Sequence, residues 1–297
     1  MIRNCNDGSN REPYLRLDIS MGNLEGLPSW SKGPKGSPEE VLSAIKAAGF
    51  QGVQGGDIAI ARQLGLGVTA GGRLSKPGEA DDLARQQKDA GVDCLTLHVG
   101  WGLEDDSALF AYVEEVLNAS SKYKLPIYIE THRATITQDP WRTLQIIKRF
   151  PEIRFNGDFS HWYTGSEMVY GGLDWKFDLL SPVFDRVRFV HGRISHPGAM
   201  QASIGDGENY PQKQWQPYVD HFRDIWTRCF TGFLRSAQPG DYICFTPELL
   251  PGWIFYAHLA PDSQGNLAES TDRWEEAILL AKIARGCFAQ AGKNLQT

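Results

Sequence analysis

The sequence predicts an α/β protein built as one (β/α)8 barrel, a fold class that three observations support. Short apolar runs typical of buried strands alternate with longer segments typical of amphipathic helices, which indicates parallel βαβ units. Eight such units fit into 297 residues, a length that suits a closed barrel better than an open doubly wound sheet. No break in composition marks a linker, so we expect a single domain over residues 1–297, with a polar extension at 1–13 and the barrel at 14–290.

Four strands are expected in the first half of the chain. The run at 14–20 (YLRLDIS) alternates well enough for a strand, and shorter apolar runs follow at 52–54, 67–71 and 93–98. A helix begins after Ser37, because Pro38 suits the first helical position and the acids behind it face the helix dipole. Further helices are expected at 57–64, 77–90 and 106–122, with loops at 21–36 and 71–76.

Four more strands are expected in the second half, and each ends in a side chain that can bind a metal ion. Their runs are 126–133 (PIYIETHR), 154–161 (RFNGDFSH), 188–193 (RFVHGR) and 242–248 (YICFTPE). The candidate ligands at their ends are Glu130, Asp158, His191 and Glu248. Helices are expected at 139–150, within 165–184, and at 213–236 and 269–290, with long loops at 194–211 and 250–268.

These four side chains are predicted to converge on one divalent cation. Active sites of such barrels lie at the carboxyl ends of the strands, and the four strands concerned are neighbours. An ionised carboxylate at the end of a buried strand is costly unless it is paired, hydrogen-bonded or bound to a metal. Oxygen and nitrogen ligands without a thiolate suit Mn²⁺, Mg²⁺, Co²⁺ or Zn²⁺, so we expect one such ion as the cofactor. The alternative for each residue alone is a salt-bridged or capping role.

Further polar and aromatic residues follow the same strands and are candidates for binding a substrate. They are His161, Arg193, His132, His98 and Trp162. Each histidine has the alternative of a structural role, and Arg193 has the alternative of an ion pair with Asp206 or Glu208. The aromatic residues after the strands could form a wall for a sugar ring or could pack at the barrel rim; these are Trp101, Trp162, Tyr163, Trp253 and Phe255.

Composition excludes several classes of protein. The formal net charge is −6 and no basic run stands out, which argues against binding to phosphate backbones. No uninterrupted apolar stretch approaches the length of a membrane span, and the polar opening MIRNCNDGSNREP lacks the apolar core of a signal peptide. The five cysteines are scattered without a CxxC motif, so we expect a reduced, cytoplasmic protein.

The four strand ends resemble those of the xylose-isomerase-like barrel superfamily, in particular its sugar phosphate isomerase/epimerase family. The resemblance rests on Glu130, on Asp158-Phe-Ser-His161, on His191 and on Pro247-Glu248. It implies one divalent metal held by the four candidate ligands, Glu130 and Glu248 as the acid/base pair, and contact between His161 and the substrate. The ketose 3-epimerases place an arginine several residues beyond the histidine that binds the metal. In this chain, by contrast, Arg193 follows His191 almost directly. We therefore do not expect their ketohexose specificity, and the loop at 194–211 is expected to decide the substrate.

The resulting prediction is a metal-dependent isomerase or epimerase of a keto sugar, sugar phosphate or related polyol, acting through an enediolate. A lyase or dehydratase that uses the same site is the alternative. A two-metal hydride shift would need more carboxylates than HGRISHPG provides, and an apurinic endonuclease would need further histidines. A non-catalytic barrel is the remaining class. The expected partner is a small-molecule carbohydrate, with no nucleic acid and no membrane, and a homo-oligomer (dimer or tetramer) stays open.

Overall fold

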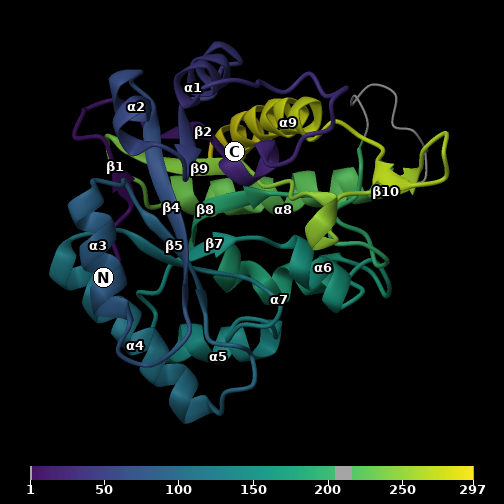
Figure 1. The fold of residues 1–297 in the computed structure, drawn as a ribbon. Coiled ribbons are helices and arrows are strands. Elements are labelled where there is room, and N and C mark those ends of the chain that lie inside the picture. Colours follow the sequence, from purple (N-terminus) through teal and green to yellow (C-terminus); the bar gives the residue numbers. More distant parts are fainter. Residues whose placement is uncertain (1, 205–215, 297) are drawn as a thin grey trace.

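Eight parallel strands close into a barrel with helices around it, as the sequence predicts (Figure 1). A computed structural model describes residues 2–204 and 216–296. Strands β2 to β9 pair in chain order, and β9 returns to pair with β2, which closes the sheet. No helix within the described ranges is both long and apolar enough to cross a membrane.

The strands are short and the helices between them are mostly of two to six turns. The barrel strands are β2 Tyr14–Ser20, β3 Gly52–Gln54, β4 Gly67–Leu74, β5 Leu95–Val99, β6 Ile127–Glu130, β7 Phe155–Gly157, β8 Val187–Gly192 and β9 Asp241–Pro247. The helices are α1 Pro38–Ala47, α2 Ile58–Gln63, α3 Ala80–Ala90, α4 Asp106–Tyr123, α5 Pro140–Arg149, α6 Ser160–Gly165, α7 Asp174–Phe184, α8 Gln216–Leu234 and α9 Arg273–Asn294.

Alternation along each strand separates the main core from the barrel interior. On β9, Phe245 packs against Trp226 of α8, with ring centroids 4.9 Å apart, so this face belongs to the core between strands and helices. Tyr242 and Cys244, on the other face of β9, belong to a separate cluster of buried residues inside the barrel. The same alternation brings the side chains at the carboxyl ends of the strands to the mouth of the barrel.

The N-terminal segment closes the opposite end of the barrel. A short strand, β1 Cys5–Asn6, pairs antiparallel with β9, with Cys5 opposite Tyr242. The Cys5 backbone amide donates to the Tyr128 hydroxyl at 3.1 Å, and that hydroxyl donates to the Arg3 carbonyl. Part of the stretch that the sequence analysis treats as a polar extension therefore belongs to the sheet.

Several elements differ from the expected ones. Strand β4 continues to Leu74 through the expected loop at 71–76, because it pairs with β5 along 70–74. Within the expected helix at 165–184 only α7 (Asp174–Phe184) forms, while α6 (Ser160–Gly165) begins inside the run 154–161 and a turn with positive φ at Gly171 and Gly172 separates the two. The expected loop at 250–268 contains a 3-10 helix, Gly252–Ile254, and a hairpin of β10 Leu259–Pro261 and β11 Leu267–Glu269. The expected helix start at Lys213 and residues 205–211 of the loop at 194–211 lie outside the described residues.

One helix start shows how local sequence positions an element. Ser37 is the N-cap of α1, and its hydroxyl accepts a hydrogen bond from the Glu40 amide. The Glu40 carboxylate in turn accepts from the Ser37 amide at 2.7 Å, which completes a capping box. The helix start predicted at Ser37 and Pro38 is confirmed.

Candidate metal centre

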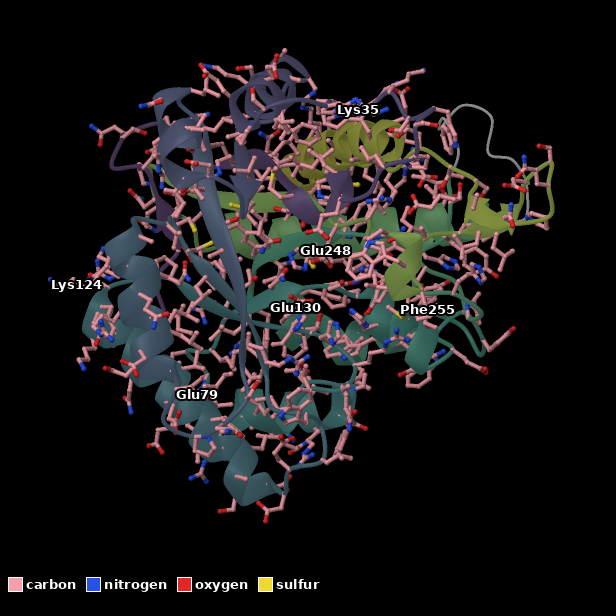
Figure 2. The ribbon with its side chains drawn as sticks, in the orientation of Figure 1. Lys35, Glu79, Lys124, Glu130, Glu248 and Phe255 are labelled. Carbon is pink, nitrogen blue, oxygen red and sulfur yellow. The ribbon has the colours of Figure 1, made fainter. Side chains whose placement is uncertain are left out.

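Four side chains from neighbouring strands meet at the mouth of the barrel. Glu130 is the last residue of β6, Asp158 follows β7, His191 lies near the end of β8 and Glu248 follows β9. One ligand atom from each lies within 4.8 Å of those of the others. Figure 2 labels Glu130 and Glu248 in the middle of the barrel. The folded chain therefore brings together all four residues that the sequence offers as metal ligands.

Glu130 is enclosed by nitrogen atoms. Its side chain is buried, Oε2 accepts a hydrogen bond from Asn156 Nδ2 at 2.9 Å, and the same oxygen lies 3.3 Å from His191 Nδ1. Its other oxygen, Oε1, lies 3.1 Å from His98 Nε2. Burial raises the pKa of Glu130, but the charges of His98 and His191 outweigh it and hold the pKa well below the usual range. The carboxylate is therefore ionised and available to a cation.

His191 is oriented by Gln54, the last residue of β3. Gln54 Nε2 donates to the Thr96 hydroxyl, so the amide oxygen faces His191 and accepts a hydrogen bond from Nε2 at 2.9 Å. This leaves Nδ1 toward Glu130, Glu248 and the Asn156 amide, whose Nδ2 lies 3.1 Å away, and an acceptor on the other ring nitrogen is the usual support of a histidine ligand. Burial lowers the pKa of His191, but Glu248 and Glu130 outweigh it and raise the pKa to about 9.

Arg193 is part of this cluster. Its Nη2 atom is paired with Asp158 Oδ2 and lies 3.3 Å from Glu248 Oε2, while Nε donates to the Ser160 hydroxyl at 3.1 Å. The Arg193 and Asp158 side chains are fully buried. The partner of Arg193 is thus Asp158, whereas Asp206 and Glu208 lie outside the described residues.

The charges of the cluster fit a divalent cation. Three carboxylates and one guanidinium leave a net charge of 3 − 1 = 2 negative units. Protonated His191 offsets one of them in the metal-free protein, and a divalent ion would replace that proton and balance both. Asn156 Oδ1 is a buried polar atom without a hydrogen bond within the described residues, as an atom facing an ion would be. The donor set of oxygens and one imidazole suits Mg²⁺, Mn²⁺, Co²⁺ or Zn²⁺.

Three histidines line one side of the carboxylates. The rings of His98 and His132 have centroids 4.1 Å apart, and those of His132 and His161 are 3.6 Å apart. Burial, together with the charge of His161, lowers the pKa of His132 to about 3, so this ring is neutral. His161 Nε2 lies 3.4 Å from Asp158 Oδ2. All three predicted substrate-binding histidines therefore lie beside the carboxylates.

A cavity of about 390 Å³ opens next to Arg193, between the loops that follow β6, β8 and β9. Its lining includes Arg133, Gln201, Phe255, Tyr256 and His258. The guanidinium carbon of Arg193 lies 4.9 Å from the centroid of the Tyr256 ring. Tyr256 also lines the cavity, so its ring lies between the cavity and the charged cluster.

The aromatic candidates occupy different environments. Trp162 is 1% exposed and its indole nitrogen donates to the Thr137 carbonyl, so it supports the loop after β6 from within the core. Trp253 and Phe255 are exposed on the loop after β9. The predicted contact between Trp162 and a substrate has no geometric basis here.

Gln54, Asn156 and Ser160 are polar residues of the cluster that the sequence analysis does not single out. Gln54 and Asn156 are buried amides within expected strands (GVQ and RFN), and Ser160 lies inside the Asp158–His161 motif. A buried amide among apolar residues is a usable signal, because such a group needs partners. The partners themselves lie on other strands, so the sequence does not identify them before the barrel is known.

In its fold the chain resembles xylose-isomerase-like TIM barrels. No protein-family model matches the chain, and no curated protein matches its sequence. The solved structures that share the fold include the following two. A xylose isomerase-like TIM barrel protein from Mycobacterium smegmatis, in complex with magnesium, has a TM-score of 0.54 at 10% identity, over 92% of this chain and 97% of its own. A probable 3-DHS dehydratase involved in petrobactin synthesis, from Bacillus anthracis, has a TM-score of 0.51 at 14% identity, over 78% of this chain and 92% of its own.

Proposed function

We propose that this protein is a divalent-metal-dependent isomerase or epimerase of a keto sugar, sugar phosphate or related polyol. The observation that carries the proposal is the convergence of ligand atoms of Glu130, Asp158, His191 and Glu248 within 4.8 Å of one another. With Arg193 included, this cluster has the charge and the donor atoms for one divalent ion. When bound, such an ion polarises a substrate carbonyl and acidifies the neighbouring C–H bond.

Glu130 and Glu248 are suited to move the proton. They come from β6 and β9, which are not neighbours in the barrel, so they approach the shared point from different sides. Glu248 is the more open of the two, with 18% of its side chain exposed against 2% for Glu130. One carboxylate takes the proton from the carbon beside the carbonyl, which leaves an enediolate. The other returns a proton to the opposite face for epimerisation, or to the adjacent carbon for isomerisation.

A lyase or dehydratase of a keto sugar or keto polyol is the second candidate, and His98 favours it. Burial lowers the pKa of His98, but the adjacent Glu130 outweighs it and raises the pKa, which favours a protonated ring beside the carboxylates. In an elimination, an acid of this kind protonates the departing hydroxyl group while a carboxylate removes the proton from carbon. The same described residues can therefore support either an elimination or an isomerisation or epimerisation.

Solvent exchange tests both candidates. The purified protein, with Mn²⁺, Mg²⁺, Co²⁺ or Zn²⁺ added, is incubated in D₂O with ketohexoses, ketopentoses, their phosphates and inosose-like keto polyols, and is followed by NMR. We expect deuterium to enter a carbon next to the carbonyl. Isomerised product without label would indicate a hydride shift, and label followed by loss of a substituent would indicate the lyase. Absence of exchange across the panel contradicts both candidates.

Two variants test the roles within the cluster. Glu130→Gln keeps an amide oxygen that can coordinate but cannot accept a proton, so exchange should fall by about 10²–10⁴-fold while much of the metal affinity remains. His191→Ala should lose metal instead. Equal loss of metal in both variants would make Glu130 a ligand only and would move the acid/base role to another residue.

A further inference from the structure

A second group of metal-binding side chains lies directly beside the first. His98, Glu130 and His132 each offer a ligand atom, and these atoms lie within 4.8 Å of one another. Glu130 belongs to both groups. The second group thus adds two imidazoles, from β5 and from the loop after β6, to a carboxylate that the proposed metal centre already uses.

The two oxygens of Glu130 face different groups. Oε2 accepts from Asn156 Nδ2 and lies near His191, whereas Oε1 lies 3.1 Å from His98 Nε2. Oε1 and His98 Nε2 thus form a close ionisable pair, and a metal ion bound to both atoms would replace the ring proton. Two ligands about 2.1 Å from one ion and roughly at right angles are themselves about 3 Å apart. Oε1 and Nε2 therefore have the spacing of atoms directed at a common third atom.

His132 is held with one nitrogen free. Its Nδ1 atom is hydrogen-bonded to the Arg133 carbonyl, and as the donor there it leaves a lone pair on Nε2. A backbone carbonyl is a common outer partner of a metal-binding histidine. The His132 backbone amide donates to the Thr137 hydroxyl at 3.2 Å, which fixes the loop that carries the ring. Neither contact uses the nitrogen that would bind an ion.

We propose that His98, Glu130 and His132 form a second metal site, bridged to the first by Glu130 and selective for Zn²⁺ or Co²⁺ over Mg²⁺. Two imidazoles and one carboxylate oxygen favour these ions, whereas Mg²⁺ favours oxygen ligands. The first group, with three carboxylates and one imidazole, takes either kind of ion. The inference rests on the proposed function only in that the two sites share Glu130.

The second ion is expected to bind more weakly than the first. A metal on His98 Nε2 places the ring proton on Nδ1, which faces Arg73 Nη2 at 3.4 Å. Arg73 is held independently, because Nη1 donates to the Gly100 carbonyl and the guanidinium lies over the Trp101 ring. Its positive charge therefore stays near the site. The second site also contributes no carboxylate of its own, so the two ions should load in sequence.

Titration of the metal-free full chain with Co²⁺ alone tests the proposal. Calorimetry and the visible absorption of Co²⁺ should show two equivalents, and the same titration with Mg²⁺ should show one. His132→Phe keeps a ring to pack between His98 and His161 but removes the ligand nitrogen, so it should bind one equivalent of Co²⁺. His221→Phe, on α8, is the matched control and should keep two.

The outcomes separate this inference from the proposed function. One equivalent of Co²⁺ in the unmodified protein, or two in His132→Phe, overturns the second site and leaves the first intact. Glu248→Ala should lose the tighter equivalent and keep the weaker one, because Glu248 belongs to the first group only. No Co²⁺ binding at all overturns both. If His132→Phe does not fold, His98→Phe replaces it, and the stoichiometry of the unmodified protein still decides the question.

Discussion

At the scale of single residues, Gln54 fixes the orientation of the His191 ring and thereby the position of its Nδ1 atom. Its amide oxygen accepts the His191 Nε2 hydrogen bond at 2.9 Å, and Gln54 is itself held by Thr96. We expect Gln54→Leu to weaken Mn²⁺ binding by about 10–100-fold, because the ring loses the acceptor that fixes its orientation. Gln54→Glu keeps an acceptor and should retain most of the affinity. Calorimetric titration with Mn²⁺ measures both, and equal affinity of Gln54→Leu and the unmodified protein would contradict the positioning role.

Arg193 and Asp158 form a fully buried ion pair, so removing one partner leaves a buried charge alone. Arg193→Met should lower the free energy of unfolding of the metal-free protein by about 3–5 kcal/mol. Urea denaturation measures this loss. Mn²⁺ should restore part of it, because the ion neutralises the carboxylates that Arg193 leaves behind.

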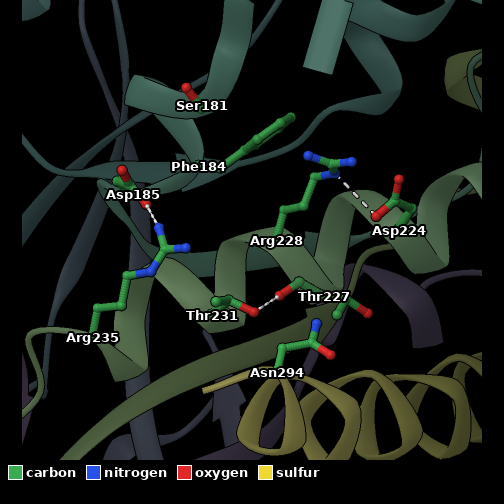
Figure 3. Close-up of a pocket in the computed structure, with 9 residues that line it drawn as sticks. All are labelled: Ser181, Phe184, Asp185, Asp224, Thr227, Arg228, Thr231, Arg235 and Asn294. Carbon is green, nitrogen blue, oxygen red and sulfur yellow. Dashed lines mark hydrogen bonds and ion pairs between the residues drawn. The ribbon is translucent and has the colours of Figure 1, made fainter. Parts of the chain in front are cut away.

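An exposed ion pair gives the control for Arg193. Figure 3 shows Arg235, which directly follows α8, paired with Asp185; the two atoms lie 3.0 Å apart and roughly half of each side chain is exposed. Arg228, which lines the same surface pocket as Arg235, is paired with Asp224, and both of these residues lie on α8. Arg235→Met should cost about 0–1 kcal/mol, as exposed pairs do. An equal cost for Arg193→Met and Arg235→Met would show that burial of the Arg193 pair has no energetic consequence.

At the scale of elements, β6 links the closed end of the barrel to its mouth. Tyr128 and Glu130 share the inner face of β6, and the Tyr128 hydroxyl bonds the N-terminal segment at Cys5 and Arg3. Tyr128→Phe should lower the free energy of unfolding by about 1–3 kcal/mol, because it leaves the Cys5 amide without its acceptor. Mn²⁺ affinity should stay within about twofold, since the bonds that hold Glu130 do not involve this hydroxyl. Denaturation and metal titration of the same sample measure both, and a large loss of affinity would show that the two ends of β6 are coupled.

At the scale of the whole molecule, local patterns predict the barrel and the residues at its strand ends. The run that ends at Glu130 is apolar, short and followed by ionisable residues, which is sufficient to predict both a buried strand and a ligand. Strand β1 is two residues long and depends on its pairing with β9, so no local pattern reveals it. Arg193 and Asp158 follow two different strands and meet only when the barrel closes, so the sequence alone could not identify Asp158 as the partner of Arg193.

A bound metal should stabilise the whole barrel, because its four proposed ligands come from β6, β7, β8 and β9 and are brought together only by folding. Binding to the folded state alone adds about 2.7 kcal/mol to the free energy of unfolding when the free ion is at 100 times its dissociation constant. We expect Mn²⁺ to raise the midpoint of thermal unfolding by several degrees in a concentration-dependent way, and EDTA to reverse the shift. Glu248→Ala should show a reduced shift, while Glu39→Ala, on the exposed first turn of α1, should behave like the unmodified protein. A midpoint that does not change with Mn²⁺ would mean that these strand ends do not form a metal site in the folded chain.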